Sequence, residues 1–482
     1  MESTARQVRD SVKAAVLLLS YVLASCAGSG EETGTGPSPP FPRVVLAESA
    51  LLAVSPPEER RWGFYQFPDM WRGPGGEIYL AMNVGEDAEV GVHEPTRFFV
   101  SRDEGSSWQS ISEGEVDFSP GIVTLPSGEE VTFGTERFVY HYSCYGHRKR
   151  REISLEELGI HPVARFMDAY KVQVFAQYRY ADIPEDLRRF PLARRSGSGS
   201  SWQQDFGTVD PSDLLLTVLV SAKNTKGEWH DIPAVVRISP YYQDGSIFRP
   251  PDWPKVVLTV SDGTLLWAHS TQDPRFERTF YRVHLLASDD GGRHWKIRGT
   301  IADQPELADV GYGCGEQSLE RMPNGDLLCV MRTQIGPGLR DPEATNHLAA
   351  VRSSDNGFTW SSPRGIAPFS VTPHLRRLGN GAVVMIYGRP GIHLRTSADS
   401  GRTWSEALTL VGPPEAKLMA MTPAVRWKMP SQISCSNTDV VINGPDRFLL
   451  AYSDFLYRDE AGIRRKAIKV QQVVVQMPPT DR

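Results

Sequence analysis

The sequence of 482 residues predicts an all-β protein, and three observations support that prediction. A turn motif with fixed internal spacing occurs four times, and a turn containing glycine precedes an apolar strand at six places. Helical periodicity is confined to short runs near 153–158 and 183–189. Short β-branched and aromatic runs between turn signals are instead typical of strands. The net charge of −6 does not indicate a nucleic-acid partner, and we expect none.

The repeated motif reads Ser-x-Asp-x-Gly-x-x-Trp. Its copies span residues 101–108, 288–295, 353–360 and 397–404. Serine and aspartate side chains bond the backbone N–H groups of tight turns, and glycine supplies the backbone freedom that such turns need. We therefore expect each copy to be a β-hairpin turn that caps itself, with its tryptophan packed beneath. The aspartates with this structural role are Asp103, Asp290, Asp355 and Asp399.

The six glycine turns divide the chain into units of similar construction. They lie at residues 74–80, 125–128, 260–266, 322–328, 378–381 and 442–445. Each unit can be extended to a four-stranded blade, and blades need neighbours to bury both of their faces. The sequence thus predicts a six-bladed β-propeller over residues 43–482, with a long insertion in the second blade at about 140–235. Residues 44–54 should add a strand to the last blade and close the ring.

The N-terminal segments follow one another in the order that is typical of an export signal. A basic leader precedes an apolar run at 14–23 that is too short to cross a bilayer. Leu23-Ala24-Ser25-Cys26 then resembles the lipobox of bacterial lipoproteins, which implies acylation of Cys26 and a membrane anchor made of lipid. An ordinary signal peptide is the alternative. Residues 27–42 read as a flexible tether. We expect an exported protein on the periplasmic or surface face of the bacterial cell envelope.

The repeated motif resembles the Asp box, or BNR repeat, of the sialidase superfamily, and the resemblance extends from about Arg61 to Gln476. In that superfamily the box is structural and lies away from the active site. An arginine triad binds the carboxylate of the sugar, a glutamate primes a tyrosine nucleophile, and an aspartate is the acid/base. The resemblance implies an exo-glycosidase that removes a terminal sialic acid or a related acidic sugar from glycans.

Three residues match the superfamily pattern. Glu316, in the stretch Gly315 to Leu319, corresponds to the priming base, and Arg332 corresponds to the second arginine of the triad. Arg389 corresponds to the third arginine, in preference to Arg395. A guanidinium suits a carboxylate because its planar fork donates two parallel charged hydrogen bonds.

Two positions depart from the pattern. Gln66 occupies the place of the first arginine, where it can donate a hydrogen bond but carries no charge, and Arg72 nearby is an alternative. The stretch 433–438 should supply the tyrosine but has none, and Cys435 is the nearest nucleophile. A disulfide between Cys435 and Cys314 is an equal alternative.

The acid/base aspartate should lie in the loop 83–95, where Asp87 is the candidate and Glu89 occupies a comparable place. Without a tyrosine, water can attack directly, with Glu316 as general base and Asp87 as general acid, which would invert the anomeric centre. The sequence indicates no cofactor and no metal site. A lectin-like propeller that binds acidic glycans without cleaving them, and a purely structural propeller, remain the competing hypotheses.

Overall fold

Strands account for nearly all the regular structure in the computed structural model. It describes residues 41–85 except 74, 96–116, strand segments between 122 and 237, 257–273, 280–303 except 293, 311–335, and 345–479 except 370. Residues 41–482 form one compact unit. The prediction of an all-β protein is confirmed, whereas the count of six blades and the insertion at about 140–235 stay predictions. In the part described, no helix is long and apolar enough to cross a bilayer.

Three antiparallel sheets have four strands each. One has the order β1-β28-β27-β26, with β1 (Arg43–Val54), β26 (Thr438–Gly444), β27 (Arg447–Asp454) and β28 (Ala467–Gln476). A second contains β2 (Gln66–Arg72), β3 (Ile78–Asn83), β4 (Thr96–Ser101) and β5 (Gln109–Ile111) in chain order. A third contains β22 (His374–Arg377), β23 (Val383–Gly388), β24 (Ile392–Ser397) and β25 (Leu408–Val411).

The middle of the chain forms a 12-stranded sheet in which antiparallel runs are joined by the parallel pairs β13–β17 and β16–β18. Its strands are β6 (Ile122–Thr124), β7 (Glu130–Phe133), β12 (Leu215–Lys223), β13 (Trp229–Arg237), β14 (Leu258–Thr259), β15 (Leu265–Asp273), β16 (Phe280–Ser288), β17 (His294–Ala302), β18 (Gly311–Arg321), β19 (Leu327–Ile335), β20 (Thr345–Ser353) and β21 (Arg364–Ala367).

Smaller elements complete the described structure. The pairs β8 (Arg165–Met167) with β9 (Val172–Val174) and β10 (Arg194–Arg195) with β11 (Gln204–Asp205) form two-stranded sheets. The helical segments are η1 (Glu113–Glu115), α2 (Glu415–Met419), α3 (Pro423–Lys428) and α4 (Pro430–Ile433). The three α-helices follow one another on the connection between β25 and β26.

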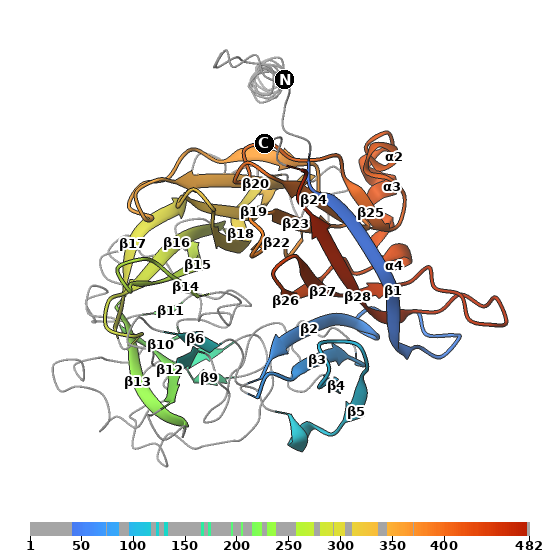
Figure 1. The fold of residues 1–482 in the computed structure, drawn as a ribbon, viewed down its shortest axis with the longest axis horizontal. Helices are drawn as coiled ribbons and strands as arrows, with labels where there is room; N and C mark the ends of the chain where they lie inside the picture. The colour runs from blue at the N-terminus through green and yellow to red at the C-terminus, as the bar shows by residue number, and fades with distance from the viewer. Residues whose placement is uncertain are drawn as a thin grey trace, which may run out of the picture. The chain divides into compact units, whose positions relative to one another are not determined.

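The two ends of the compact unit share one sheet. β1 pairs antiparallel with β28, from Arg43 opposite Gln476 to Val54 opposite Ala467. Figure 1 shows this pairing, with β1 in blue alongside β28 in red. The prediction that residues 44–54 supply a strand to the last sheet is confirmed. The pairing places the loop after β1, which precedes β2, next to the loop that precedes β28, as the hydrogen bond from Ser55 N to Lys466 O shows.

The hydrophobic core lies between consecutive sheets. Four of the buried clusters combine residues from two neighbouring sheets or antiparallel runs, as predicted for elements that cannot bury their faces alone. Representative pairs within single clusters are Leu80 with Leu449, Leu285 with Cys329, Val330 with Val383, and Val384 with Phe448.

The Asp-box turns adopt the self-capped form expected from their sequence. In the third box, Ser353 Oγ accepts a bond from Gly357 N (2.8 Å) and donates to Asp355 Oδ1 (2.7 Å). Asp355 in turn accepts bonds from Thr359 N (2.9 Å) and Thr359 Oγ1 (2.6 Å), and Trp360 Nε1 donates to Gly357 O (3.0 Å). The hydroxyl just before the tryptophan is a part of the box that the sequence reasoning missed.

The box glycine also brings neighbouring sheets together. Gly357 has a φ of 90°, and a Cβ at this position would overlap the buried side chain of Leu285 on β16. The first and fourth boxes repeat this contact, with Gly105 against Leu449 of β27 and Gly401 against Leu328 of β19. The box therefore needs glycine for two reasons, its backbone conformation and the close approach of the next sheet.

Candidate active site

Glu316 and Arg332 meet at a bulge between β18 and β19. The register shifts between Gly315, which is opposite Arg332, and Ser318, and Glu316 lies within this irregular segment with a φ of 47°. Arg332 Nη1 donates to Glu316 Oε1 at 2.7 Å. The arginine is 6% exposed, whereas the glutamate side chain is 37% exposed, so the carboxylate is accessible to a ligand. The structure thus brings together two residues that the sequence placed 16 positions apart.

A chain of hydrogen bonds continues from Glu316 to Arg389. Thr372 N donates to Glu316 Oε2 at 2.7 Å, and Thr372 Oγ1 accepts a bond of 3.0 Å from Asn437 Nδ2. Asn437 Oδ1 accepts a bond of 2.9 Å from Arg389 Nη2, which also donates to Cys435 O at 2.9 Å. These contacts link residues from three sheets. We call Glu316, Arg332, Thr372, Arg389 and Asn437 the site network.

The network keeps Glu316 ionised. Burial of the carboxyl raises its pKa, but the Arg332 guanidinium, the N–H of Thr372 and the nearby charge of Arg389 together outweigh that effect. The pKa of Glu316 therefore lies below its usual value. Each carboxylate oxygen accepts one bond within the network, and an ionised carboxylate has about four acceptor positions. Glu316 can thus accept a proton or hydrogen bond from a ligand hydroxyl or a water molecule.

Strained backbone gathers around this network. Nine residues other than glycine have a positive φ in the described part of the chain: Tyr65, Phe67, Glu104, Glu316, Asn356, Thr372, Arg389, Ser400 and Ser436. Glu104, Asn356 and Ser400 belong to Asp-box turns. The other six lie in the site network or in the segments 65–67 and 435–437 that adjoin it. Left-handed backbone in such residues costs about 1 kcal/mol or more each, and clusters of it are typical of functional sites.

Gln66 begins β2 beside this network. It is 0% exposed, and neither its Oε1 nor its Nε2 has a hydrogen-bond partner. The residues on both sides of it have left-handed backbone. The same segment reaches Arg389 through aromatic contacts, because Trp62 packs edge-on against Phe67 at 5.9 Å and the Arg389 guanidinium lies 5.8 Å from the Trp62 ring centroid. A buried amide without partners costs folding free energy and is uncommon outside functional sites.

Arg72 does not take the place of the first arginine. It ends β2, whereas Gln66 begins that strand, and it forms a bidentate ion pair with Glu104 (2.7 and 2.8 Å) in the first Asp box. That alternative is wrong. Arg395 also lies elsewhere, paired with Glu415 at 2.6 Å and bonded to Tyr387 Oη, which agrees with the choice of Arg389 over Arg395.

Cys435 lies beneath the network rather than within it. Its side chain is 0% exposed, and Sγ is 3.0 Å from Ser453 Oγ. Only its backbone carbonyl reaches Arg389. Cys435 is a free thiol, so the alternative of a disulfide with Cys314 is wrong. The burial of Sγ does not favour the role of nucleophile that the sequence suggested.

The remaining expectations concern residues outside the described ranges. Asp87 and Glu89 belong to the segment 86–95, and Cys26 belongs to the N-terminal 40 residues, none of which the structure describes. Conversely, the sequence reasoning missed Thr372 and Asn437 as members of the network. The sequence could have identified Asn437, because it lies two residues after Cys435 in the stretch 433–438 that should supply the nucleophile. No local signal marks Thr372.

Comparisons with known proteins agree with this fold. Residues 249–459 match the family model of the BNR repeat-like domain, and this segment includes the last three Asp boxes and the whole site network. The BNR repeat expected from the sequence is thereby confirmed over that segment. No curated protein matches the chain.

Among solved structures, a protein of unknown function from Dyadobacter fermentans is 16% identical, with a TM-score of 0.51, over 90% of this chain and 99% of that one. An α-L-arabinanase of Penicillium chrysogenum, complexed with arabinobiose, is 13% identical, with a TM-score of 0.43, over 88% and 98%. The NanB sialidase of Streptococcus pneumoniae is 14% identical, with a TM-score of 0.41, over 93% and 72%. The first of these similarities shows the fold alone.

Proposed function

We propose that this protein is a glycoside hydrolase that removes a terminal acidic sugar, sialic acid or a relative of it, from glycans. The observation that carries the proposal is the position of an accessible, ionised Glu316 between Arg332 and the bonded chain that ends at Arg389. Two guanidiniums beside one carboxylate supply both an anion-binding surface and a base. The BNR repeat-like domain, with the motif resemblance to sialidases, supports a six-bladed propeller as the scaffold.

In this proposal the residues have distinct tasks. Arg332 and Arg389 bind the carboxylate of the sugar, because guanidinium groups are suited to bidentate contacts with that group. Glu316 accepts the proton of the attacking group, which is a water molecule if no side chain acts as nucleophile. Asp87 donates a proton to the leaving group. Analysis of the product anomer separates the inverting course from a retaining one, since retention would rule out direct attack by water.

Export and attachment through a lipid at Cys26 are part of the same proposal. They rest on the sequence of the leader and would place the enzyme at the bacterial cell envelope, where glycans are accessible. Labelling with a radioactive or alkyne-bearing fatty acid tests this part, and Cys26→Ser should abolish the label. A labelled Cys26→Ser protein would contradict it.

A second candidate function is glycan binding without cleavage. It is favoured by one observation, the burial of Cys435 Sγ in a stretch that has no tyrosine. Such a lectin would use the same arginines for the same acidic sugars.

Hydrolysis of fluorogenic glycosides separates these functions. The substrates are the 4-methylumbelliferyl sialoside and a panel of uronic and other ulosonic glycosides, and the variant is Arg389→Ala. We expect turnover of at least one acidic glycoside and a loss of about a hundredfold in kcat/KM in the variant. Binding of the sugar without turnover would establish the lectin, and neither binding nor turnover on the panel would contradict both functions.

A further inference from the structure

A second site lies at the C-terminal end of β18, beyond Glu316. A pocket of about 470 Å³ is formed by the end of β18, the turn that leads to β19, the end of β22, and residues 257–259 around β14. Arg321 follows Glu316 by five positions, which is at most roughly 17 Å along a strand. The pocket shares no lining residue with the site network.

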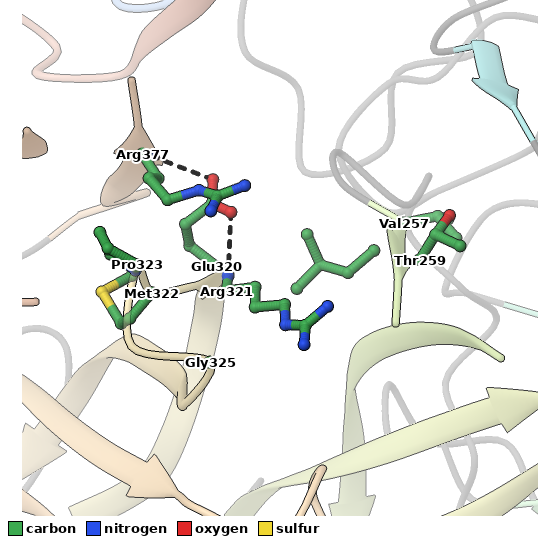
Figure 2. A pocket seen from close by; sticks show the side chains of 9 residues that line it. Val257, Thr259, Glu320, Arg321, Met322, Pro323, Gly325 and Arg377 are labelled. Carbon is green, nitrogen blue, oxygen red and sulfur yellow. Dashed lines mark hydrogen bonds between the residues drawn. The ribbon is translucent and has the colours of Figure 1, made fainter. Parts of the chain in front are cut away.

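Two arginines line this pocket, Arg321 at the end of β18 and Arg377 at the end of β22. Figure 2 shows Arg321 extending toward the wall that contains Val257 and Thr259, with Arg377 beside Glu320. Neither guanidinium forms a hydrogen bond or an ion pair with another residue that the structure describes. Both guanidiniums therefore bring positive charge to one pocket without a partner among the described residues.

Glu320 offsets this charge only in part, because it forms no ion pair with either guanidinium. Its two carboxylate oxygens accept bonds from the backbone N–H groups of Arg321 (2.9 Å) and Arg377 (3.1 Å), rather than from their guanidiniums. The charge of the buried Arg376 also faces Glu320. Burial raises the pKa of the Glu320 carboxyl, and these charged and hydrogen-bonded neighbours offset that only in part. The Glu320 carboxylate therefore fixes the backbone of the two arginines, and their guanidiniums remain available to bind a ligand.

We infer that this pocket binds an oxyanion, such as a sulfate or phosphate group, between Arg321 and Arg377. Guanidiniums recognise such groups through charge-assisted hydrogen bonds. The volume exceeds that of the ion alone, so the pocket also accommodates a sugar that carries the group as an ester. A free inorganic ion and a sulfated glycan share this chemistry, and the choice of probes separates them.

The test is calorimetric titration of the whole protein with sodium sulfate, N-acetylglucosamine 6-sulfate and unmodified N-acetylglucosamine, at constant ionic strength set with chloride. We expect both sulfate probes to bind and the unmodified sugar not to bind at this pocket. Tighter binding of the sulfated sugar than of sulfate would identify an ester as the ligand, and equal binding would identify the free ion. Arg321→Ala and Arg377→Ala should each weaken binding about fivefold to tenfold.

A matched control removes two exposed arginines from other places, Arg364→Ala with Arg402→Ala, which changes the net charge equally. This control should leave the affinity for sulfate unchanged, whereas the Arg321→Ala/Arg377→Ala double variant should abolish binding. Glu320→Gln removes a negative charge from the pocket and should tighten binding severalfold, an effect that loss of structure cannot produce. Absence of sulfate binding, or an equal loss in the control, would overturn the inference.

Discussion

The Asp-box turns and the site network both hold residues in left-handed backbone, but they stabilise them in different ways. In the third box every bond that supports the turn joins residues within eight positions of one another, from Ser353 to Trp360. In the site network, Thr372 bonds to Glu316, 56 positions away, and to Asn437, 65 positions away. The boxes are local structures, whereas the network exists only when three sheets are assembled.

This difference separates stability from function. A box turn lies on the connection between two strands and packs its glycine against the next sheet. Substitutions in the turn should therefore lower the free energy of unfolding without changing the catalytic activity. The network retains strained backbone at Glu316, Thr372 and Arg389, which lowers stability, and it does so around an accessible carboxylate. Substitutions there should change activity more than stability.

Gly357→Ala should destabilise the fold by about 3 kcal/mol, because alanine disfavours the φ of 90° and its Cβ would overlap Leu285. Gly325→Ala is the matched control, since Gly325 has nearly the same φ of 91° but nothing lies within 4 Å of the added Cβ. It should cost only about 1 kcal/mol. Urea denaturation measures both. Equal costs would show that the packing against the next sheet contributes nothing.

Asn437→Ala should lower kcat/KM about a hundredfold, because it removes the link between Arg389 and Thr372 and frees both to move from their positions. The free energy of unfolding should fall by only about 1 kcal/mol, because Arg389 Nη2 keeps its bond to Cys435 O and the groups left behind are partly buried. Steady-state kinetics and denaturation on the same preparation check both parts. A variant that loses stability but keeps its activity would reverse the assignment of this residue.

Asp355→Ala should produce the opposite pattern to Asn437→Ala. It removes the acceptor for Thr359 N and Thr359 Oγ1 and the partner of Ser353, at a cost of about 1 to 2 kcal/mol. The kinetic constants of the variant should match those of the wild type at a temperature where both are folded. A selective loss of kcat would mean that the box communicates with the site.

Ser436→Gly should increase the free energy of unfolding by about 1 kcal/mol. Ser436 has a φ of 62°, and its buried hydroxyl has no hydrogen-bond partner, so glycine relieves the strain and removes an unsatisfied group. Thermal denaturation gives the sign directly. A lower melting temperature would indicate that this strained residue contributes to stability after all.

The smallest expected effect is a change in stability at low pH. Hydrogen bonds from Thr359 lower the pKa of Asp355 to about 2. A carboxyl with a lowered pKa adds stability above its ordinary pKa, and that contribution is lost as the pH falls toward the lowered value. The difference in stability between the wild type and Asp355→Ala should therefore be constant above about pH 5 and shrink between pH 4 and pH 2. A difference that stays constant to pH 2 would contradict this.

The contrast also explains what the sequence could predict. The box turns follow from residues inside one eight-residue motif, so the serine and aspartate bonds to the turn backbone were expected, whereas the bonds of Thr359 Oγ1 and Trp360 Nε1 were not. Glu316, Arg332 and Arg389 were found through a family resemblance, and the structure brings them into one network. Thr372 was missed because it precedes a proline, a position that normally adopts extended backbone, yet its φ is 38°. The burial of Cys435 could not be predicted, because the sequence does not show which side chains of the segment between α4 and β26 lie below the surface.

The most direct test of the account compares two identical substitutions in two carboxylate–arginine pairs. Glu316→Gln alters the pair with Arg332 in the site network, and Glu104→Gln alters the pair with Arg72 in the first Asp box. The measurement is kcat/KM of both variants and the wild type on the best acidic glycoside of the panel. The account predicts a loss of at least a thousandfold for Glu316→Gln and less than a twofold change for Glu104→Gln. Comparable activity in both variants would show that Glu316 takes no part in catalysis.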